Sequence, residues 1–260
     1  MRCSDIMERL EQLSPVSFAE EWDNVGLLCG RMEKEIHSVM IALDATDTVI
    51  EQALLHKVDL LLTHHPMIFG KLNRVTSDHF IGRRIVKLIR NDINYYAMHT
   101  NFDVMGMADA VADEFGLKKR EVLDITYEDD IAKEGIGRSG VLPQIMTLQE
   151  CAEYCKQVFG LAQVKVFGDL TQTIETAAIV PGSGKDYIPL SVAKKADVLI
   201  TGDITHHNGM DAVLQGINII DAGHYGLEKI FKPYMVEVFK REMPQLLVIE
   251  AKEESPFKII

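Results

Sequence analysis

The sequence contains no apolar run that approaches the roughly 20 residues needed for a membrane-spanning helix. Its first stretch, MRCSDIMERLEQLSP, also lacks the unbroken apolar core of a signal peptide. The spacing of apolar residues in this stretch is instead typical of a short amphipathic helix. We therefore expect a cytoplasmic protein that has no membrane partner.

Cysteines are few, and acidic residues outnumber basic ones. Of the four cysteines, Cys3, Cys29, Cys151 and Cys155, only the last two are close in sequence, and their spacing places them on successive turns of one helix. This pattern favours neither a disulfide framework nor a thiolate metal site. The 27 basic residues face 39 acidic ones, giving a net charge of −12, so no basic stripe supports direct nucleic-acid binding.

The composition is that of an ordinary globular protein. The chain has 260 residues, of which 47% are hydrophobic, and its mean hydropathy is +0.03. This length is sufficient for one large domain or two modest ones with a substantial core. Acidity suits cation binding, but most acidic proteins are simply well hydrated, so composition alone indicates no function.

The sequence contains an internal repeat. The stretches Ile36–Thr63 and Ile174–Thr201 align with a constant offset of 138 positions. In each, a short β-rich segment is followed by a polar loop, an amphipathic helix and a buried strand, which predicts a β-loop-α-β unit used twice. Identical pairs in this alignment include Ile36/Ile174, Ile41/Ile179, Lys57/Lys195, Asp59/Asp197, Leu61/Leu199 and Thr63/Thr201.

The likeness continues beyond these stretches. A helix and a strand follow each of them, and the strands carry the related sequences INYYAMHTNFD and INIIDAGHYGLE. Each strand ends in a histidine that is followed four positions later by a carboxylate, His99 with Asp103 and His224 with Glu228. Because several matches occur in the same order, we interpret the chain as a duplication.

The predicted fold is α/β, with two similar halves, mixed sheets flanked by helices and a metal site in the cleft between the halves. We expect the first half over residues 1–125 and the second over 126–240, with a C-terminal strand in 241–260 that packs back onto the first half. A helix is expected from about Thr147 to Phe159, where TLQE is a plausible capping box. The stretch TYEDDIAKEGIGRSGVLP is expected to form loop and strand.

Histidines and carboxylates collect just past the predicted strands, where ligands bind in α/β sheets. The set contains His64, His65, His99, Asp103, Asp203, His206, His207, His224 and Glu228. One histidine at a strand end is usually a core or cap residue, and histidine pairs can also form a pH-sensitive interface. Six together with three carboxylates indicate instead a site for zinc, iron, manganese or cobalt.

The H-x-x-x-[DE] spacing gives a more specific expectation. On a helix, residues four positions apart share one face, so each histidine and its carboxylate can hold the same ion. The motif occurs once in each half, which provides more ligands than one ion needs. It points to two ions about 3.5–4 Å apart.

At these residues the sequence resembles the Nif-three-like family, catalogued as GTP cyclohydrolase 1 type 2 homologs. The segments EEWDNVGLLCG, THHP, HTNFD, ITGDITHH and DAGHYGLE carry the resemblance, which covers nearly the whole chain. It implies a dinuclear metal centre between two similar halves and a ring-shaped homohexamer. The segment between the halves is too short for the central insertion of some members, so this is the compact form. The ligands implied at matching positions are His64, His65, Asp103, His224 and Glu228.

Other polar residues are candidates for supporting roles. His99 either binds metal directly or orients a ligand. The segment with Asp203, His206 and His207 occupies the position that THHP holds in the first repeat, so these residues either line the pocket and move protons or form a capped loop at its rim.

Two further motifs can each be interpreted in two ways. Trp22, Asp23 and Asn24 form either a wall of the substrate site or a structural turn. PGSGKD, from Pro181 to Asp186, lacks the first glycine and the Ser/Thr of a P-loop, although a strand-to-helix turn there could still bind an anion through backbone N–H groups.

Two classes of function fit these residues. The first is a metal-dependent hydrolase, in which two divalent ions polarise a carbonyl or phosphoryl oxygen and activate water. The family resemblance implies ring opening of GTP, and the same centre could hydrolyse a phosphoester or a peptide. The second is a non-catalytic metal-binding regulator or metal chaperone. Both classes need the same ligands, so the sequence leaves both open, together with the identity of the metal.

Overall fold

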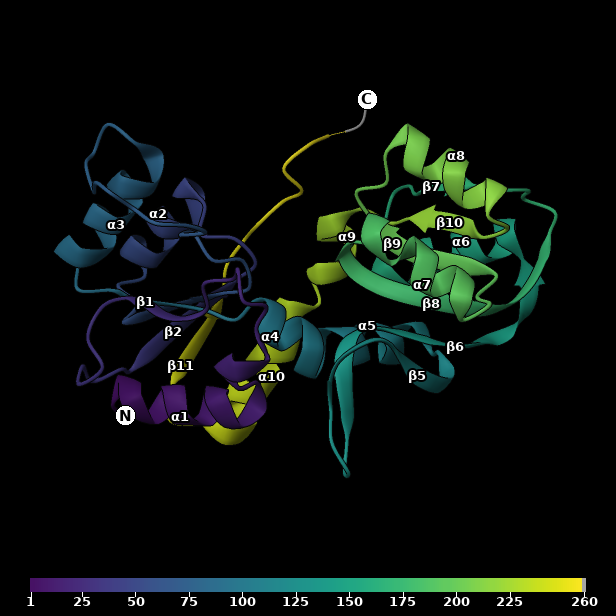
Figure 1. The fold of residues 1–260 in the computed structure, drawn as a ribbon. Coiled ribbons are helices and arrows are strands. Elements are labelled where there is room, and N and C mark those ends of the chain that lie inside the picture. The colour runs from purple at the N-terminus through teal and green to yellow at the C-terminus, as the bar shows by residue number, and fades with distance from the viewer. Residues whose placement is uncertain (259–260) are drawn as a thin grey trace. The chain divides into compact units, whose positions relative to one another are not determined.

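The structure, a computed structural model, describes residues 1–258 and contains two mixed β-sheets flanked by helices (Figure 1). Its contacts separate into two compact units. The first contains Met1–Phe102 together with the chain from Phe231 onward, and the second is Asp103–Ile230. The helix Ala108–Phe115 belongs to the second unit because it packs on strands of the second sheet.

The first unit contains a five-stranded sheet in the order β1-β4-β3-β2-β11. Strands β4, β3, β2 and β11 are parallel, and β1 pairs antiparallel with β4. The C-terminal strand β11 therefore lies at an edge of this sheet, beside β2. The strands are β1 (Gly26–Cys29), β2 (Ser38–Ala42), β3 (Leu60–Thr63), β4 (Asn94–Ala97) and β11 (Leu247–Glu250).

Helices cover both faces of this sheet. Figure 1 shows α2 and α3 on one face and α1 and α10 on the other. Because side chains alternate along a strand, Met40, Leu61 and Tyr95 pack among the apolar residues of α2 and α3, and their neighbours point to the opposite face. The helices are α1 (Cys3–Leu13), η1 (Val16–Phe18), α2 (Asp47–Leu55), α3 (Phe80–Arg90), α4 (Thr100–Phe102) and α10 (Phe231–Glu242).

The second unit contains a six-stranded sheet in the order β5-β6-β8-β9-β10-β7. Strands β8, β9 and β10 are parallel, and the remaining pairs are antiparallel. The strands are β5 (Lys118–Glu128), β6 (Lys133–Thr147), β7 (Lys165–Phe167), β8 (Thr173–Ser183), β9 (Val198–Gly202) and β10 (Asn218–Asp221).

Helices also flank the second sheet. Helices α7 and α8 contribute to one apolar cluster with β8, β9 and β10, and α5 and α6 pack against β6 (Figure 1). The expected helix after Thr147 is confirmed as α6, and Thr147 and Glu150 form the predicted capping box. The helices are η2 (Asp103–Met107), α5 (Ala108–Phe115), α6 (Leu148–Phe159), η3 (Lys185–Tyr187), α7 (Ile188–Ala193), α8 (His206–Leu214) and α9 (His224–Glu228).

The two sheets preserve the predicted repeat in their strand register. Val39 lies opposite Leu60 in the first sheet, and Ala177 lies opposite Val198 in the second, which is the same pairing shifted by 138 positions. The third strand of each repeat follows with equivalent register, at Asn94 and Asn218. The predicted mixed α/β fold with two sheets and flanking helices is therefore confirmed.

The identical lysine–apolar–aspartate steps of the repeat have the same structural role in both copies. Lys57 and Lys195 adopt left-handed backbone conformations, with φ of 52° and 57°. Asp59 and Asp197 each accept two successive backbone N–H groups from the neighbouring strand, at 2.8 and 3.1 Å and at 2.9 and 2.9 Å. These contacts tie the start of one parallel strand to the next and account for the conserved spacing between the copies.

We also considered whether any helix could cross a membrane. None of the helices formed by residues 1–258 combines the length and apolar character that crossing a bilayer would require.

Candidate metal centre

His64 and His65 follow directly after the buried strand β3. The ring of His64 is fully buried, and its Nδ1 lies 2.8 Å from the backbone oxygen of Met98. Because a carbonyl oxygen can only accept a hydrogen bond, Nδ1 carries the proton in the neutral ring, and Nε2 holds the lone pair. The local structure thus sets His64 in the tautomer whose Nε2 could coordinate a metal ion.

His65 is oriented by a carboxylate from the neighbouring strand connection. Its Nδ1 donates to Asp44 Oδ1 at 2.9 Å. The backbone of this connection is held in turn by Glu253, whose carboxylate accepts the N–H groups of Leu43 and Asp44 at 2.8 and 3.0 Å. The C-terminal segment therefore fixes the loop that orients His65.

Asp23 holds His99 in the same manner. His99 Nδ1 donates to Asp23 Oδ2 at 2.9 Å, and the same oxygen accepts the backbone N–H of Thr100 at 3.0 Å and its hydroxyl at 2.6 Å. Burial alone would raise the pKa of Asp23, but the hydrogen bonds from His99 and Thr100 outweigh it and lower the pKa to about 2. Asp23 is therefore an ionised anchor for His99.

The first unit brings three histidines together. One potential ligand nitrogen from each of His64, His65 and His99 lies within 4.8 Å of the others, so the group could hold a metal ion. The ring centroids are 4.8 to 5.5 Å apart. Two ligands implied by the family resemblance and the additional candidate His99 thus form one cluster.

The second unit brings together His224 and Glu228. Both belong to α9, and their four-residue spacing places His224 Nε2 2.9 Å from Glu228 Oε2. His224 Nδ1 donates to Asp203 Oδ2 at 2.8 Å. Asp203 has a left-handed backbone, with φ of 60°, directly after β9. The imidazole is therefore held by one carboxylate and faces another.

A glycine provides the space that Glu228 occupies. Gly182 has a φ of +74°, and a Cβ atom at this position would lie 2.5 Å from Glu228 Oε1. Gly182 belongs to the PGSGKD segment that resembles a phosphate loop in sequence. In the structure this segment allows the backbone to approach the buried carboxylate closely.

Gly182→Ala is therefore expected to displace Glu228 and to lower the affinity for Zn²⁺ about 10–100-fold, as loss of an orienting partner commonly does. The matched control is Gly216→Ala, because Gly216 also has a positive φ, +87°, but no atom lies within 4 Å of its added Cβ. Both variants carry the backbone strain of about 1–2 kcal/mol, and only the first should lose affinity in a calorimetric Zn²⁺ titration. Equal affinities would contradict the role of Gly182.

The remaining predicted residues lie in three places. Asp103 is the first residue of the π-helix η2, a rare element that often occurs at functional sites. Asp203 contacts His224, as described above. His206 and His207 are exposed at the start of α8, and their ring centroids are 5.3 Å apart. No group of three or more potential metal ligands within residues 1–258 includes either of them.

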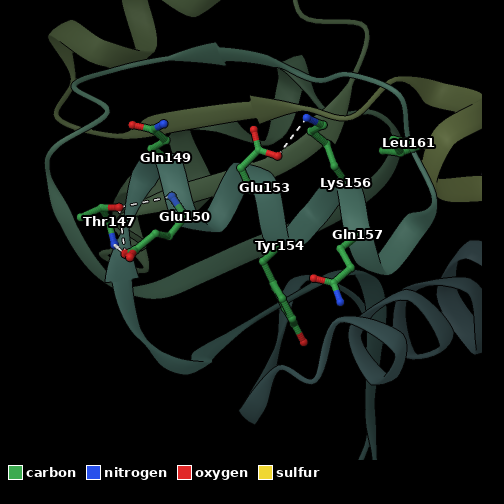
Figure 2. Close-up of a pocket in the computed structure, with 8 residues that line it drawn as sticks. All are labelled: Thr147, Gln149, Glu150, Glu153, Tyr154, Lys156, Gln157 and Leu161. Carbon is green, nitrogen blue, oxygen red and sulfur yellow. Dashed lines mark hydrogen bonds and ion pairs between the residues drawn. The ribbon is translucent and has the colours of Figure 1, made fainter.

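Helix α6 carries a surface depression of about 780 Å³ on its exposed side (Figure 2). Its buried side carries Cys151 and Cys155, and burial raises the pKa of Cys151 to about 12, which keeps it a thiol. None of the candidate metal ligands lines the depression. The lining residues are Thr147, Gln149, Glu150, Glu153, Tyr154, Lys156, Gln157 and Leu161.

The sequence indicates only some of the residues that orient the histidines. Asp44 lies in the polar loop DATD after the first strand of the repeat, and this position is the only sequence feature that points to it. Asp23 belongs to WDNVG, for which the sequence predicts a substrate wall or a structural turn and not an anchor for His99. Nothing in the sequence around Glu253 or Gly182 indicates their contacts with the site.

A mixed α/β fold that carries oriented histidines beside acidic residues matches one known family. The model of the family Duf34/NIF3 (NGG1p interacting factor 3) matches residues 1–256, and the chain belongs to this family. The GTP cyclohydrolase 1 type 2 homolog of Clostridium perfringens is 36% identical over 267 residues, which covers 100% of both chains. The homolog of Clostridium acetobutylicum is 36% identical over 230 residues, 88% of this chain and 85% of that protein.

Solved structures agree with this assignment. The Staphylococcus aureus protein SA1388 has a TM-score of 0.90 and 31% identity, and the match covers 100% of this chain and 99% of that one. Reduced HcgD from Methanocaldococcus jannaschii has a TM-score of 0.84 and 30% identity, with 97% and 98% covered. The family predicted from the sequence motifs is confirmed.

Proposed function

We propose that this protein is a metal-dependent hydrolase that acts on a nucleotide or another phosphoester. In this proposal two divalent metal ions are bound per subunit, and His99 either adds a ligand or orients one. The proposed ligands are His64, His65, Asp103, His224 and Glu228.

The observation that carries the proposal is the orientation of four imidazoles. The Nδ1 atoms of His64, His65, His99 and His224 each lie 2.8–2.9 Å from a carbonyl or carboxylate oxygen. Metal-binding histidines characteristically donate their other ring N–H to such a group, which fixes the ring and raises its basicity. A single arrangement of this kind occurs in many cores, but four at predicted metal-binding positions favour a metal centre.

The donor set fits the proposed ions. Imidazole nitrogens and carboxylate oxygens are common ligands of zinc, iron, manganese and cobalt. The 2.9 Å separation of His224 Nε2 and Glu228 Oε2 lets both atoms contact one ion. When bound, divalent ions would polarise a carbonyl or phosphoryl oxygen and lower the pKa of water toward about 7.

The remaining residues have supporting roles in this proposal. Asp203 orients His224, and Asp23 and Asp44 orient His99 and His65. His206 and His207, which are exposed at the start of α8, are the candidates for moving protons to and from water.

The names of the relatives support a nucleotide as substrate, and GTP is the first one to test. A second candidate function is non-catalytic metal binding, in regulation or metal delivery. One observation favours it: Asp203 is engaged by His224, and neither His206 nor His207 belongs to a potential metal-binding group in the described part of the chain.

Turnover of GTP separates the two functions. Metal-loaded protein is expected to hydrolyse GTP, and Glu228→Ala should lower the steady-state rate at least about 100-fold through loss of metal. Glu153→Ala, a change of an exposed carboxylate on α6 in the same unit, should leave the rate unchanged. The absence of turnover of nucleotides, phosphoesters and peptides by fully metal-loaded protein would overturn the hydrolase and leave the binding role.

We also propose that the chain assembles with itself into a ring-shaped hexamer and acts in the cytoplasm. The family resemblance supports the assembly. The cytoplasm is supported by the thiols, since all four cysteines are free and three of them are buried.

A further inference from the structure

Two large aromatic side chains are exposed beside the histidine cluster of the first unit. Trp22, the only tryptophan of the chain, is 61% exposed, and Phe69 is 54% exposed. Their ring centroids lie 5.9 and 5.8 Å from that of His99, with interplanar angles of 75° and 88°. Both rings thus contact the same imidazole edge-to-face and still present most of their surface to the outside.

The segments that carry these rings are firmly held. Asp23, next to Trp22, accepts hydrogen bonds from His99 and from Thr100, as described above. Asn24 Nδ2 donates to the backbone oxygen of Ile68 at 2.6 Å, which ties the Trp22 segment directly to the Phe69 segment. The backbone next to each ring is therefore held by hydrogen bonds, and both rings are exposed on ordered segments.

We propose that Trp22 and Phe69 bind the planar base of a nucleotide beside His64, His65 and His99. The inference rests on the proposed function and names the part of the substrate that the protein recognises. Exposed aromatic faces bind bases by stacking, which needs no charge and tolerates different bases. Lys71 and Arg74, which are exposed in the chain that follows Phe69, supply positive charge of the kind that phosphates require.

The fluorescence of Trp22 tests the proposal directly, because no other tryptophan contributes to it. Guanosine and GTP are expected to change the emission of zinc-loaded protein saturably, while ribose 5-phosphate and inorganic triphosphate should not. Trp22→Leu and Phe69→Leu should each lower the affinity for GTP at least about 10-fold in equilibrium dialysis, and Trp22→Phe should retain it.

Phe80→Leu is the matched control, because Phe80 is also exposed and lies in the same unit at the start of α3. Bound zinc and circular dichroism, measured for every variant, separate loss of base binding from loss of the site or of the fold. Unchanged GTP affinity in both leucine variants, or an equal response to inorganic triphosphate, would overturn the proposal. Absence of GTP turnover would count against the hydrolase alone, since this test measures binding.

Discussion

His65→Ala is expected to lower the affinity for Zn²⁺ or Mn²⁺ by more than about 100-fold. Loss of a residue that merely orients a ligand costs about 10–100-fold, and this change removes a proposed ligand itself. The imidazole is held by Asp44 at 2.9 Å, and alanine leaves that carboxylate without the ring. Elemental analysis after dialysis and calorimetric titration measure the loss.

His37→Ala provides the control for this change. His37 is an exposed histidine of the same unit and lies outside the cluster formed by His64, His65 and His99. Its replacement should leave the bound metal unchanged. Asp103→Ala tests the proposed ligand at the start of η2 by the same measurement, and unchanged stoichiometry in both His65→Ala and Asp103→Ala would remove both residues from the ligand set.

Glu253→Ala is expected to weaken both the fold and the metal site. The Glu253 side chain is 6% exposed, holds the backbone of Leu43 and Asp44, and lies 3.5 Å from the buried ammonium of Lys232. Removing one partner of a buried ion pair costs about 3–5 kcal/mol. We expect about 3 kcal/mol, because Lys232 retains the backbone oxygen of Ala251 at 3.1 Å.

The effect on metal follows from the loop that Glu253 holds. Without its carboxylate the backbone at Asp44 is less restrained, so His65 loses a fixed orientation, and we expect about 10–100-fold weaker binding of Zn²⁺. Urea unfolding of the metal-free protein and Zn²⁺ titration of the folded protein measure the two effects separately.

The neighbouring Glu254 provides the matched control. It is 82% exposed and its ion pair with Lys258 lies in solvent, so Glu254→Ala should change neither quantity. A folded Glu253→Ala protein that binds Zn²⁺ like the parent would show that Asp44 is held without the C-terminal segment.

Local spacing accounts for the parts of the structure that the sequence predicts well. The repeat register follows from apolar patterns that recur with a fixed offset, and the α6 cap follows from a four-residue motif. The contact of His224 with Glu228 follows from helical periodicity, since residues four apart on a helix are neighbours.

The orienting carboxylates could not be predicted in the same way. Asp44 is 21 residues from His65, Asp23 is 76 residues from His99, and Glu253 is 209 residues from Asp44. Such pairs depend on which strand ends the sheet brings together, and no pattern within a single segment encodes them. The sequence of one chain therefore indicates the histidines but not the carboxylates that orient them.

The long hairpin of β5 and β6 shows a different limit. The sequence predicts loop and strand for part of this region, whereas β5 alone spans Lys118–Glu128. On β5, Leu123, Ile125 and Tyr127 alternate with polar residues, but only Leu123 is buried, so most of the strand contributes nothing to the core. Its turn is set by Asp129, which accepts the backbone N–H groups of Ile131 and Ala132 at 2.8 Å.

The sequence repeat also shows how far the copies have diverged. At the offset of 138 positions, Asp44 aligns with Gly182 and His65 aligns with Asp203. In the first copy, Asp44 in the loop after β2 orients His65. In the second copy that position is Gly182, and Asp203 in the loop after β9 orients His224. In a symmetric dimer of identical chains, equivalent positions must carry the same residue. Two copies within one chain can carry different residues at these positions, so the duplication within a single chain allows each copy to orient its histidine differently.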